Sequence, residues 1–361
     1  MHRLCFAAVL LMPLAAVGCS GGGASSPAPR PSPSPTANGL PAITEYNVGP
    51  ASPAPALNAA SITAGPDGAL WFLANTPVRS VGRITMAGTS TLYPAGAFGG
   101  LIAMGTGPDG ALWFTGSSSA SSDALIGRIS TAGSVTSFDI TQDDPHLTAP
   151  YCIATGSDGA LWFTNFASSL IGRITTTGTL TTYSVTAPAG IPQVNGVVSG
   201  PDGALWYTGY VQSITASKIQ VTPLLGRITT AGTITDYNAA AVSAGVQVPD
   251  KIVAGPDGSL WFADWSTGHS AIGRMTTGGS VTEFTLPATS RPTDITVGPD
   301  NALWFADGSA NAIGRITTGG SIVEYSTGIS PNASPSSIAL GADGALWFTE
   351  LNYNKVGRLV P

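Results

Sequence analysis

The chain has 361 residues and a formal net charge of −6, and only 9% of its residues are charged. This balance argues against nucleic acid or an anionic membrane surface as its main partner, because both are bound through clustered Lys and Arg. The 46 glycines, together with abundant Thr and Ser, instead predict an all-β protein with many tight turns.

Residues 1–19 resemble the secretory leader of a bacterial lipoprotein. Arg3 precedes an apolar run over residues 4–17, which is too short to span a bilayer and is typical of a signal segment. The sequence AVGC at positions 16–19 is similar to a lipobox, in which the cysteine becomes the lipidated first residue of the mature protein. We therefore predict lipidation at Cys19. An ordinary signal peptide with a chance cysteine is the alternative.

The segment after Cys19, residues 20–41, is rich in Pro, Ser and Gly and cannot form a helix or a sheet interior. We interpret it as an extended tether between a membrane and the rest of the chain. Leader and tether together predict a bacterial extracytoplasmic protein, anchored to the outer membrane or cell surface by lipid alone. Cys5 would be lost with the leader, so Cys152 is expected to have no disulfide partner.

Residues 42–361 consist of one repeated unit. Near-copies of Gly-Pro-Asp-Gly begin at Gly65, Gly107, Gly156, Gly200, Gly255, Gly298 and Gly341, between 42 and 55 residues apart. Each copy is followed by a Leu-Trp pair and then by a Gly-Arg pair. The turn residues and the apolar runs between them divide each unit into four short antiparallel strands. Four strands in a period of this length are typical of a propeller blade.

The two ends of the repeat region predict how the ring closes. The seventh unit stops at residues 358–361, before a fourth strand, whereas an orphan fourth strand, residues 43–46, precedes the first unit. Pairing the two would leave no exposed edge. The sequence therefore predicts a monomeric seven-bladed β-propeller of four-stranded blades, closed by its N-terminal strand.

Comparing the seven units with one another separates scaffold from site. The Trp, Arg and turn Asp occur in every unit, so we interpret them as structural, with the Trp packed between blades. Length and chemistry vary after the second strand and before the first, and both positions lie on the same face of a propeller. Blade four carries an insertion there, within residues 208–224. Function is therefore expected on this variable face, at the mouth of the central channel.

Two kinds of side chain gather at these variable positions. At the ends of three successive second strands are carboxylates that could hold Mg²⁺ or Ca²⁺: Asp264, Asp307 and Glu350. Candidate ligand-binding residues are the charged Asp250, Lys251 and Asp294, and an aromatic shelf of Tyr151, Phe166, Tyr210, Trp265 and Tyr353. The alternatives are that each carboxylate caps its own loop and that the aromatic rings are rim packing.

The repeat GPDGALWFT…IGRITTxGxxTxY closely resembles that of the streptogramin B lyases, the virginiamycin B lyase family, over residues 43–361. The resemblance implies a propeller fold and a magnesium-dependent elimination that opens a cyclic depsipeptide at its ester bond. It also implies a His after a Pro before the first strand of each of the last two blades, with two Glu beside the second of these.

That catalytic set is not retained at the matching positions. Thr293 and Ser336 stand where the family has its two His, and Ser334 stands in place of one Glu. The second Glu would fall near Glu350 or Leu351, and the aromatic residue expected before blade one is Ala60. Thr and Ser are not general bases. Neither remaining histidine of the repeat region replaces them, because His146 lies on the loop into blade three and His269 on the blade-five loop. His269 and Glu350 are left as the catalytic candidates.

These observations support a leading hypothesis and two alternatives. The first is a membrane-anchored binding propeller for a glycan, a peptide or another small molecule, which requires no cofactor. The second is a metal-dependent C–O lyase with an active site rebuilt around Asp264, Asp307, Glu350 and His269. The third is a purely structural surface protein. Nucleic acid is not an expected partner in any of them.

Overall fold

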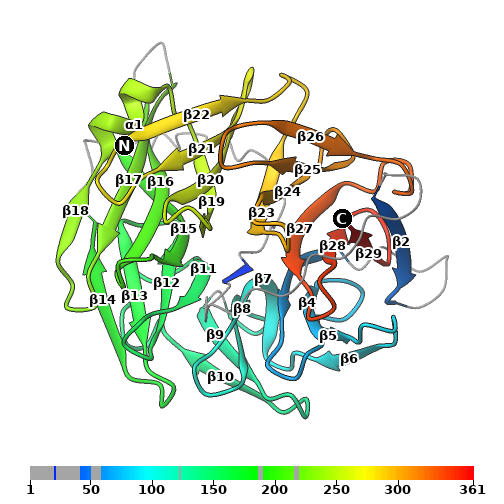
Figure 1. Ribbon diagram of the computed structural model, residues 1–361. Helices are drawn as coiled ribbons and strands as arrows, with labels where there is room; N and C mark the ends of the chain where they lie inside the picture. Colours follow the sequence, from blue (N-terminus) through cyan, green and yellow to red (C-terminus); the bar gives the residue numbers. More distant parts are fainter. Residues whose placement is uncertain (1–19, 22–40, 50–57, 122, 186–189, 215–218) are drawn as a thin grey trace, which may run out of the picture.

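The protein is described by a computed structural model over residues 20–21, 41–49, 58–121, 123–185, 190–214 and 219–361. In this part of the chain, seven antiparallel sheets form a ring around a central channel (Figure 1). The predicted leader, the predicted lipidation of Cys19 and nearly all of the predicted tether lie outside the described residues. No helix in the described part is long and apolar enough to cross a membrane.

The first four blades follow the chain in order, with the first strand innermost. Blade 1 contains β3 (Ala59–Ala64), β4 (Leu70–Ala74), β5 (Ser80–Ile84) and β6 (Ser90–Pro94). Blade 2 contains β7 (Phe98–Thr106), β8 (Leu112–Ser118), β9 (Ala124–Ile129) and β10 (Val135–Asp139). Blade 3 contains β11 (Pro150–Thr155), β12 (Leu161–Asn165), β13 (Leu170–Ile174) and β14 (Leu180–Ser184). Blade 4 contains β15 (Ile191–Ser199), β16 (Leu205–Ile214), β17 (Ile219–Ile228) and β18 (Ile234–Asp236).

The last three blades complete the ring. Blade 5 contains β19 (Pro249–Ala254), β20 (Leu260–Ser266), β21 (His269–Met275) and β22 (Val281–Thr285). Blade 6 contains β23 (Pro292–Val297), β24 (Leu303–Asp307), β25 (Ala312–Ile316) and β26 (Ile322–Tyr325). Blade 7 contains β27 (Pro335–Leu340), β28 (Leu346–Glu350), β29 (Lys355–Val360) and, from the other end of the chain, β2 (Ala42–Asn47). Each first strand contacts the first strands of both neighbouring blades, so these seven strands line the channel.

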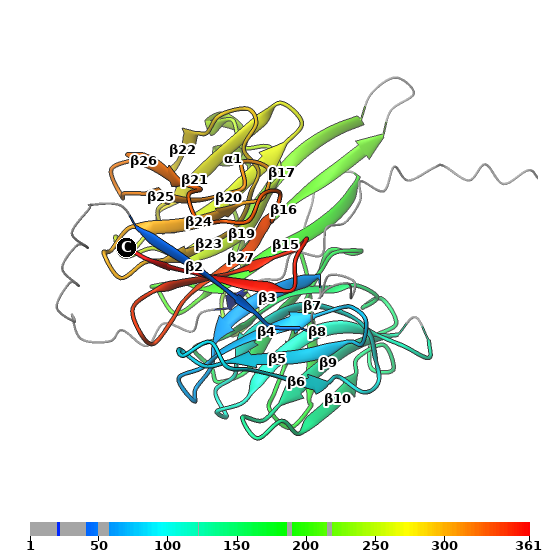
Figure 2. The same ribbon diagram turned by 90° about the vertical axis from the view of Figure 1, so that its right-hand side faces the viewer.

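The predicted ring closure is confirmed. β2 pairs antiparallel with β29 along its whole length, from Ala42 opposite Val360 to Asn47 opposite Lys355. The dark blue β2 and the dark red β29 lie side by side in both views (Figures 1 and 2). Tyr46 of β2 stacks on Trp347 of β28 with ring centroids 5.4 Å apart. The closing strand therefore supplies the same aromatic contact that a fourth strand supplies in the other blades.

The repeated polar residues form one bonded unit in each blade, as the structural interpretation predicted. In blade 5, Nε1 of Trp261 and Nε of Arg274 donate to the two carboxylate oxygens of Asp257, at 3.0 and 2.7 Å. The seven repeat Trp are at most 1% exposed and pack between neighbouring blades. The glycine of each Gly-Arg pair makes room for a ring: a Cβ on Gly273 would lie 2.1 Å from Phe262. These residues belong to the scaffold.

Blade 4 departs most from the repeat. The insertion is not an irregular loop, because its described residues extend β16 and β17 into a ten-residue antiparallel pair that projects beyond the neighbouring blades (Figure 2). The short helix α1 (Asn238–Ala244) then leads toward blade 5 and ends at Gly245. Gly245 has a φ of 95°, which favours glycine, and it contributes to closing the last helical turn.

One short strand comes from the far N-terminal segment. β1 (Ser20–Gly21) pairs in parallel with Met104–Gly105 of β7 and contacts β3, β11 and β27. It is the small dark blue arrow near the centre of the ring (Figure 1). The backbone of these two residues therefore lies against the wall of the central channel.

Candidate functional site

A β-bulge at the same place in the first strand of each blade shapes the mouth of the channel. The pairing of strands one and two shifts register between Pro150 and Ile153 in blade 3 and between Pro249 and Ile252 in blade 5, and equivalent shifts occur in the other five blades. A bulge re-aims the side chains that it contains. The residues within or beside the bulges of blades 3 to 7 include Tyr151, Cys152, Asn195, Asp250, Lys251, Thr293 and Ser336.

Buried threonines connect one bulge to the next. Thr164 accepts a hydrogen bond from the amide of Cys152 in its own blade and donates to the carbonyl of Asn195 in blade 4, at 3.0 and 2.5 Å. Thr115 and Thr208 make the equivalent pairs of bonds in blades 2 and 4. These bonds satisfy backbone groups that the bulges remove from the sheet ladder. The bulge residues are therefore held in fixed positions around the channel.

Six of the eight predicted ligand-binding residues gather in one cluster, contributed by blades 3 to 6. Nζ of Lys251 lies 4.0 Å from the ring centroid of Tyr151 and 3.2 Å from Oδ1 of Asp250. The Tyr151 hydroxyl donates a long hydrogen bond of 3.4 Å to Oδ2 of Asp250, and the Tyr151 ring packs against Phe166 at 5.5 Å. Tyr210 and Asp294 are close enough to interact electrostatically with the Asp250 and Lys251 charges, respectively.

Burial and charge set the protonation states in this channel cluster, defined as Tyr151, Phe166, Tyr210, Asp250, Lys251 and Asp294. Burial and then Asp250 raise the pKa of both tyrosines to about 12, so both hydroxyls remain protonated donors at neutral pH. Burial acts to lower the pKa of Lys251, but Asp250, Tyr151 and Asp294 together outweigh it and the pKa is raised, which keeps the ammonium charged. Burial raises the pKa of Asp294 to about 6, although the hydrogen bonds that it accepts from Ser337 and Ile338 act to lower this pKa.

The edge of the channel cluster is accessible to solvent. Lys251 is only 1% exposed, whereas the side chain of Asp250 is 33% exposed and Tyr210 and Phe166 are partly exposed. The cluster therefore presents a carboxylate, a phenol and ring surface over a buried cation. Phenol, carboxylate and ring surface together can hydrogen-bond and stack with a polar ring-bearing molecule.

The other two predicted ligand-binding residues lie apart from this cluster. The guanidinium of Arg291, on the loop before β23, lies 4.3 Å from the ring centroid of Trp265, near the end of β20. The hydroxyl of Tyr353 donates to the carbonyl of Pro331 at 3.0 Å in blade 7. The predicted single aromatic shelf is thus divided, with Tyr151, Phe166 and Tyr210 in the channel cluster and Trp265 and Tyr353 packed at the rim.

The structure does not gather Asp264, Asp307 and Glu350 into the shared metal site that the sequence suggested. Asp264 accepts the amides of Gln247 and Val248 at 2.8 and 2.6 Å. Asp307 accepts the amides of Arg291, Ser309 and Ala310 through one oxygen. Both carboxylates therefore cap their own loops, as the alternative held. Among the described residues, the three do not form a group of potential metal ligands.

Each of these carboxylates is instead associated with a second one from the fourth strand of its own blade. The partners are Glu283 in blade 5, Glu324 in blade 6 and Glu45 in blade 7. Each partner lies opposite the glycine of the Gly-Arg pair in the third strand. In blade 5, Asp264 pairs with Ala271 and Glu283 pairs with Gly273, so the two carboxylates project from the same face of the blade. The comparison of the seven sequence repeats did not single out these three glutamates. Their positions in the fourth-strand pattern were nevertheless visible in the sequence.

The side chain that lies beside the carboxylate pair differs between blades 5 and 7. In blade 5, Nε2 of His269 lies 2.9 Å from Oδ2 of Asp264 and 3.5 Å from Oε1 of Glu283. In blade 7, Nζ of Lys355 contacts Glu45 at 2.6 Å. Burial and then Asp264 raise the pKa of Glu283 to about 9. The carboxylate pairs are thus three separate sites in three blades, with His269 in one of them.

We predict that Glu350 makes folding stability depend on pH. It is fully buried, and burial followed by the interaction with Glu45 raises its pKa from 4.5 to about 8. Between pH 4.5 and 8 the folded state therefore holds a proton that the unfolded state has released, so stability falls as pH rises, by up to about 1.4 kcal/mol per pH unit. Glu350→Gln should remove this slope and melt at a higher temperature than wild type at pH 8.

Thermal melts from pH 5 to pH 9 would measure this effect, with exposed Asp143→Asn as the matched control. The control should keep the wild-type pH profile. Melting curves of Glu350→Gln that run parallel to wild type across this range would contradict the assignment.

The residues at the two positions to which the sequence resemblance assigns histidine are buried hydroxyls. The Thr293 hydroxyl of β23 lies within hydrogen-bond distance of the carbonyls of Ala306 and Pro335, at 3.1 and 3.3 Å, and its single hydrogen can donate to either. Ser336 of β27 is fully buried and bonds to Thr349 and to the carbonyl of Ala59. Both hydroxyls are hydrogen-bonded to other groups of the sheets. Neither is therefore placed to accept a proton from a substrate.

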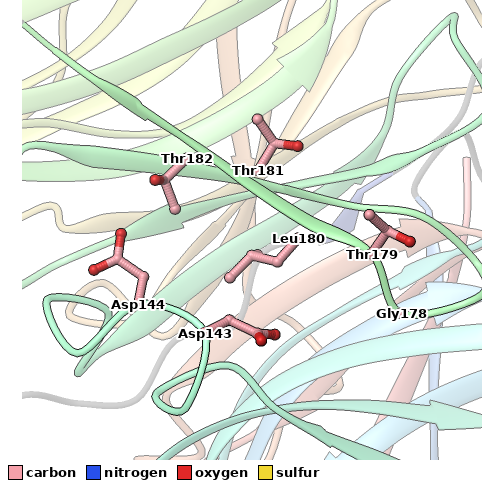
Figure 3. Close-up of a pocket in the computed structure, with 7 residues that line it drawn as sticks. All are labelled: Asp143, Asp144, Gly178, Thr179, Leu180, Thr181 and Thr182. Atoms are coloured by element: carbon pink, nitrogen blue, oxygen red, sulfur yellow. The ribbon is translucent and has the colours of Figure 1, made fainter.

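A pocket of about 420 Å³ lies elsewhere, on the outside of blade 3 (Figure 3). It is lined by Asp143 and Asp144 on the loop before β11 and by residues 178–182 of the β13–β14 turn and β14. Figure 3 shows the two carboxylates on one side and the threonines along the strand on the other. None of the predicted site residues lines it, so it is separate from the channel cluster.

The expectation that Cys152 has no disulfide partner is wrong. Cys152 is fully buried in the bulge of β11 and is disulfide-bonded. The chain has three cysteines, and the other two, Cys5 and Cys19, lie outside the described residues. The sequence argument failed because it removed Cys5 and assigned Cys19 to a lipid.

The fold and this geometry define a class of protein: a seven-bladed propeller with a register shift in the first strand of every blade, near the channel mouth. The chain belongs to the virginiamycin B lyase family, which it matches over residues 41–223 and 220–361. The predicted family resemblance and fold are therefore confirmed. Comparison with curated protein sequences gave no match.

Solved structures agree with this family. The chain is similar to a streptogramin B lyase, with 29% identity over 89% of this chain and 97% of the other and a TM-score of 0.71. It is also similar to a catalytically inactive variant of virginiamycin B lyase from Staphylococcus aureus with quinupristin, with 30% identity over 89% and 100% and a TM-score of 0.71. The extracellular domain of a hybrid two-component system from B. thetaiotaomicron shares the fold at 13% identity, over 88% and 41%, with a TM-score of 0.66.

Proposed function

We propose that the propeller binds a small polar ligand with a ring, a carbohydrate in the first instance, at the channel cluster. The observation that carries this proposal is the convergence of Tyr151, Asp250 and Lys251 at the bulges of two blades. The buried ammonium contacts Tyr151 and Asp250, while Asp250 and Tyr210 remain partly exposed. Fixed donors, acceptors and ring faces on a rigid strand framework suit recognition of a sugar or a similar ring-bearing molecule. A peptide is the other ligand class that such a surface would accept.

The test uses a glycan and peptide array followed by calorimetry on the hits. Tyr210→Ala and Asp250→Asn alter the exposed edge of the cluster without removing the buried ammonium, and each should weaken binding at least tenfold. Tyr353→Ala, an exposed tyrosine in blade 7, is the matched control and should bind like wild type. Binding that is unchanged in both cluster variants, or the absence of any bound class, would refute this function.

We further propose that the propeller is extracytoplasmic and is attached to a membrane through lipid on Cys19. The support is the leader, the lipobox-like AVGC and the Pro-rich segment that follows. The same fold forms the extracellular domain of a B. thetaiotaomicron protein, which is compatible with this location. A Cys19 thiol that carries lipid cannot also form a disulfide, so lipid and disulfide exclude each other at that residue.

We predict that Cys19→Ser releases the protein from the membrane fraction while the propeller stays folded, because the anchor is the only membrane attachment proposed. Fractionation with a salt wash measures the release, and mass spectrometry of the mature N-terminus identifies the lipid. Cys152→Ser is the control and should remain with the membrane. A Cys19→Ser protein that still sediments with washed membranes would remove the anchor from the proposal.

One observation favours a second function, a metal-dependent C–O lyase with a rebuilt site. The chain belongs to a lyase family, and His269 makes close contacts with two carboxylates in blade 5. Asp307 and Glu350 do not join that group among the described residues. Turnover of a streptogramin B substrate that is abolished by His269→Ala would favour this function over binding alone.

A further inference from the structure

Three strands of blade 5 bring together the Asp264, His269 and Glu283 side chains. Asp264 is near the end of β20, His269 begins β21, and Glu283 lies in the middle of β22. In the register of the sheet, Asp264 pairs with Ala271 and Glu283 pairs with Gly273, and both lie at even spacings from His269. Alternate residues of a strand point to the same face. All three side chains therefore project from one face of the blade.

The distances between the potential ligand atoms suit a small ion. Nε2 of His269 is 2.9 Å from Oδ2 of Asp264 and 3.5 Å from Oε1 of Glu283, and one potential ligand atom from each residue lies within 4.8 Å of the others. Around a tetrahedral zinc with ligands at about 2.0–2.1 Å, neighbouring ligand atoms are about 3.3 Å apart. The two separations from Nε2 of His269 lie on either side of that value, so small side-chain movements would complete the geometry.

One of the three groups is held in place by hydrogen bonds, and a second is buried with an unsatisfied oxygen. Asp264 is fully buried, and its oxygens accept the amides of Gln247 and Val248 on the segment between α1 and β19. The Glu283 side chain is only 10% exposed, and its Oε1 is buried without a hydrogen-bond partner among the described residues. A buried oxygen without a hydrogen bond is costly. This second, independent observation indicates a missing partner for Glu283 inside the group.

The other two blades with carboxylate pairs show why blade 5 is different. In blade 6 the hairpin turns directly after Asp307, which pairs with Ala312, so no strand residue occupies the place of His269. In blade 7 the Lys355 ammonium already contacts Glu45. Blade 5 has a longer hairpin, ending with Ser266 opposite His269, and this extension supplies the imidazole.

We propose that Asp264, His269 and Glu283 form a binding site for one divalent transition-metal ion, zinc in particular. The ligand atoms are Oδ2 of Asp264, Nε2 of His269 and Oε1 of Glu283. One imidazole with two carboxylates selects zinc and its neighbours over magnesium and calcium, which take oxygen ligands. His269 is 21% exposed, so the ion enters past the β20–β21 turn and a water completes its coordination. The site is new to blade 5 and independent of the channel cluster.

The test uses tag-free, full-length protein that is stripped with a chelator and then dialysed against zinc. Elemental analysis should give one zinc per chain, and titration calorimetry should give a single site that millimolar magnesium or calcium does not fill. Zinc should also raise the melting temperature, because the ion joins β20, β21 and β22. X-ray diffraction at the zinc absorption edge would place the ion.

His269→Ala and Glu283→Gln should each weaken zinc binding at least tenfold and remove the zinc-dependent rise in melting temperature. Two variants are matched controls: Glu324→Gln alters the corresponding glutamate in blade 6, and His146→Ala removes the other histidine of the propeller. Both should bind one zinc like wild type. Circular dichroism of the metal-free variants separates a loss of zinc binding from a loss of folding.

Two results would overturn the proposal. One is a wild-type protein that retains no zinc after dialysis, and the other is a folded His269→Ala variant that still binds zinc with wild-type affinity. Zinc that is lost in His146→Ala instead would place the metal on the blade 3 loop, which also contradicts the blade 5 site.

Discussion

Internal deletion of residues 42–47 from the full-length chain is expected to lower the free energy of unfolding by roughly 4 kcal/mol or more, or to cause aggregation. The deletion removes the whole ladder between β2 and β29, which runs over six residue pairs. It also removes the stacking of Tyr46 on Trp347, worth about 0.5–1.5 kcal/mol beyond its area, and leaves the ammonium of Lys355 without Glu45. β29 would then be an unpaired edge strand, which is a template for association with other chains.

Chemical denaturation followed by Trp fluorescence would measure this loss, and light scattering would detect association. Thr44→Ala, at an exposed position in the middle of β2, is the matched control and should change stability by less than about 0.5 kcal/mol. Tyr46→Ala tests the same seam without a backbone change and should fall between the control and the deletion. If the deletion variant denatures like wild type, the closing strand is not what completes the ring.

Incubation with a streptogramin B substrate is expected to give no ring opening above background, with or without magnesium. The elimination needs a base that removes a proton, and general-base assistance is commonly worth about 10²–10⁴-fold in rate. At the positions that the family resemblance assigns to histidine, this chain has Thr293 and Ser336, whose hydroxyls are buried and hydrogen-bonded to other groups. No group that titrates near neutrality occupies either position.

Liquid chromatography with mass detection would measure linear product, with the Staphylococcus aureus enzyme as positive control. A rate within about 10²-fold of that enzyme would contradict the expectation. Any turnover should then be compared between wild type, His269→Ala and His146→Ala. Loss in His269→Ala alone would locate the base in blade 5 and would support the rebuilt lyase.

The fold was accessible from the sequence because it depends on a local unit that repeats seven times. Trp261, Arg274 and Asp257 contact one another within a single blade, so their spacing in the chain already contains their geometry. Ring closure was also accessible, since residues 43–46 carry the fourth-strand pattern that the last unit lacks. The first prediction concerns contacts made within one repeat. The second concerns a strand whose absence from the last repeat is visible in the sequence.

The site was only partly accessible. The positions of Tyr151, Asp250 and Lys251 were identifiable because they vary between units while the scaffold does not. Their convergence required the bulges, where strands one and two change register, and the spacing of the repeat does not specify those shifts. The insertion in blade 4 was visible as extra length, but its pairing into longer β16 and β17 strands was not.

The carboxylates show most clearly what only the tertiary structure decided. By sequence, Asp264, Asp307 and Glu350 occupy one repeat position, which suggested that they meet in one site. In the ring, equivalent residues lie in different blades, whereas Asp264 of strand two and Glu283 of strand four project from the same face of one blade. Asp264 therefore meets Glu283 and His269, and Glu350 meets Glu45 from the other end of the chain. The sequence by itself determined which residues repeat. The packing of strands within each blade determined which of these residues contact one another. Such contacts depend on strand register and strand order, which the spacing along the chain does not specify.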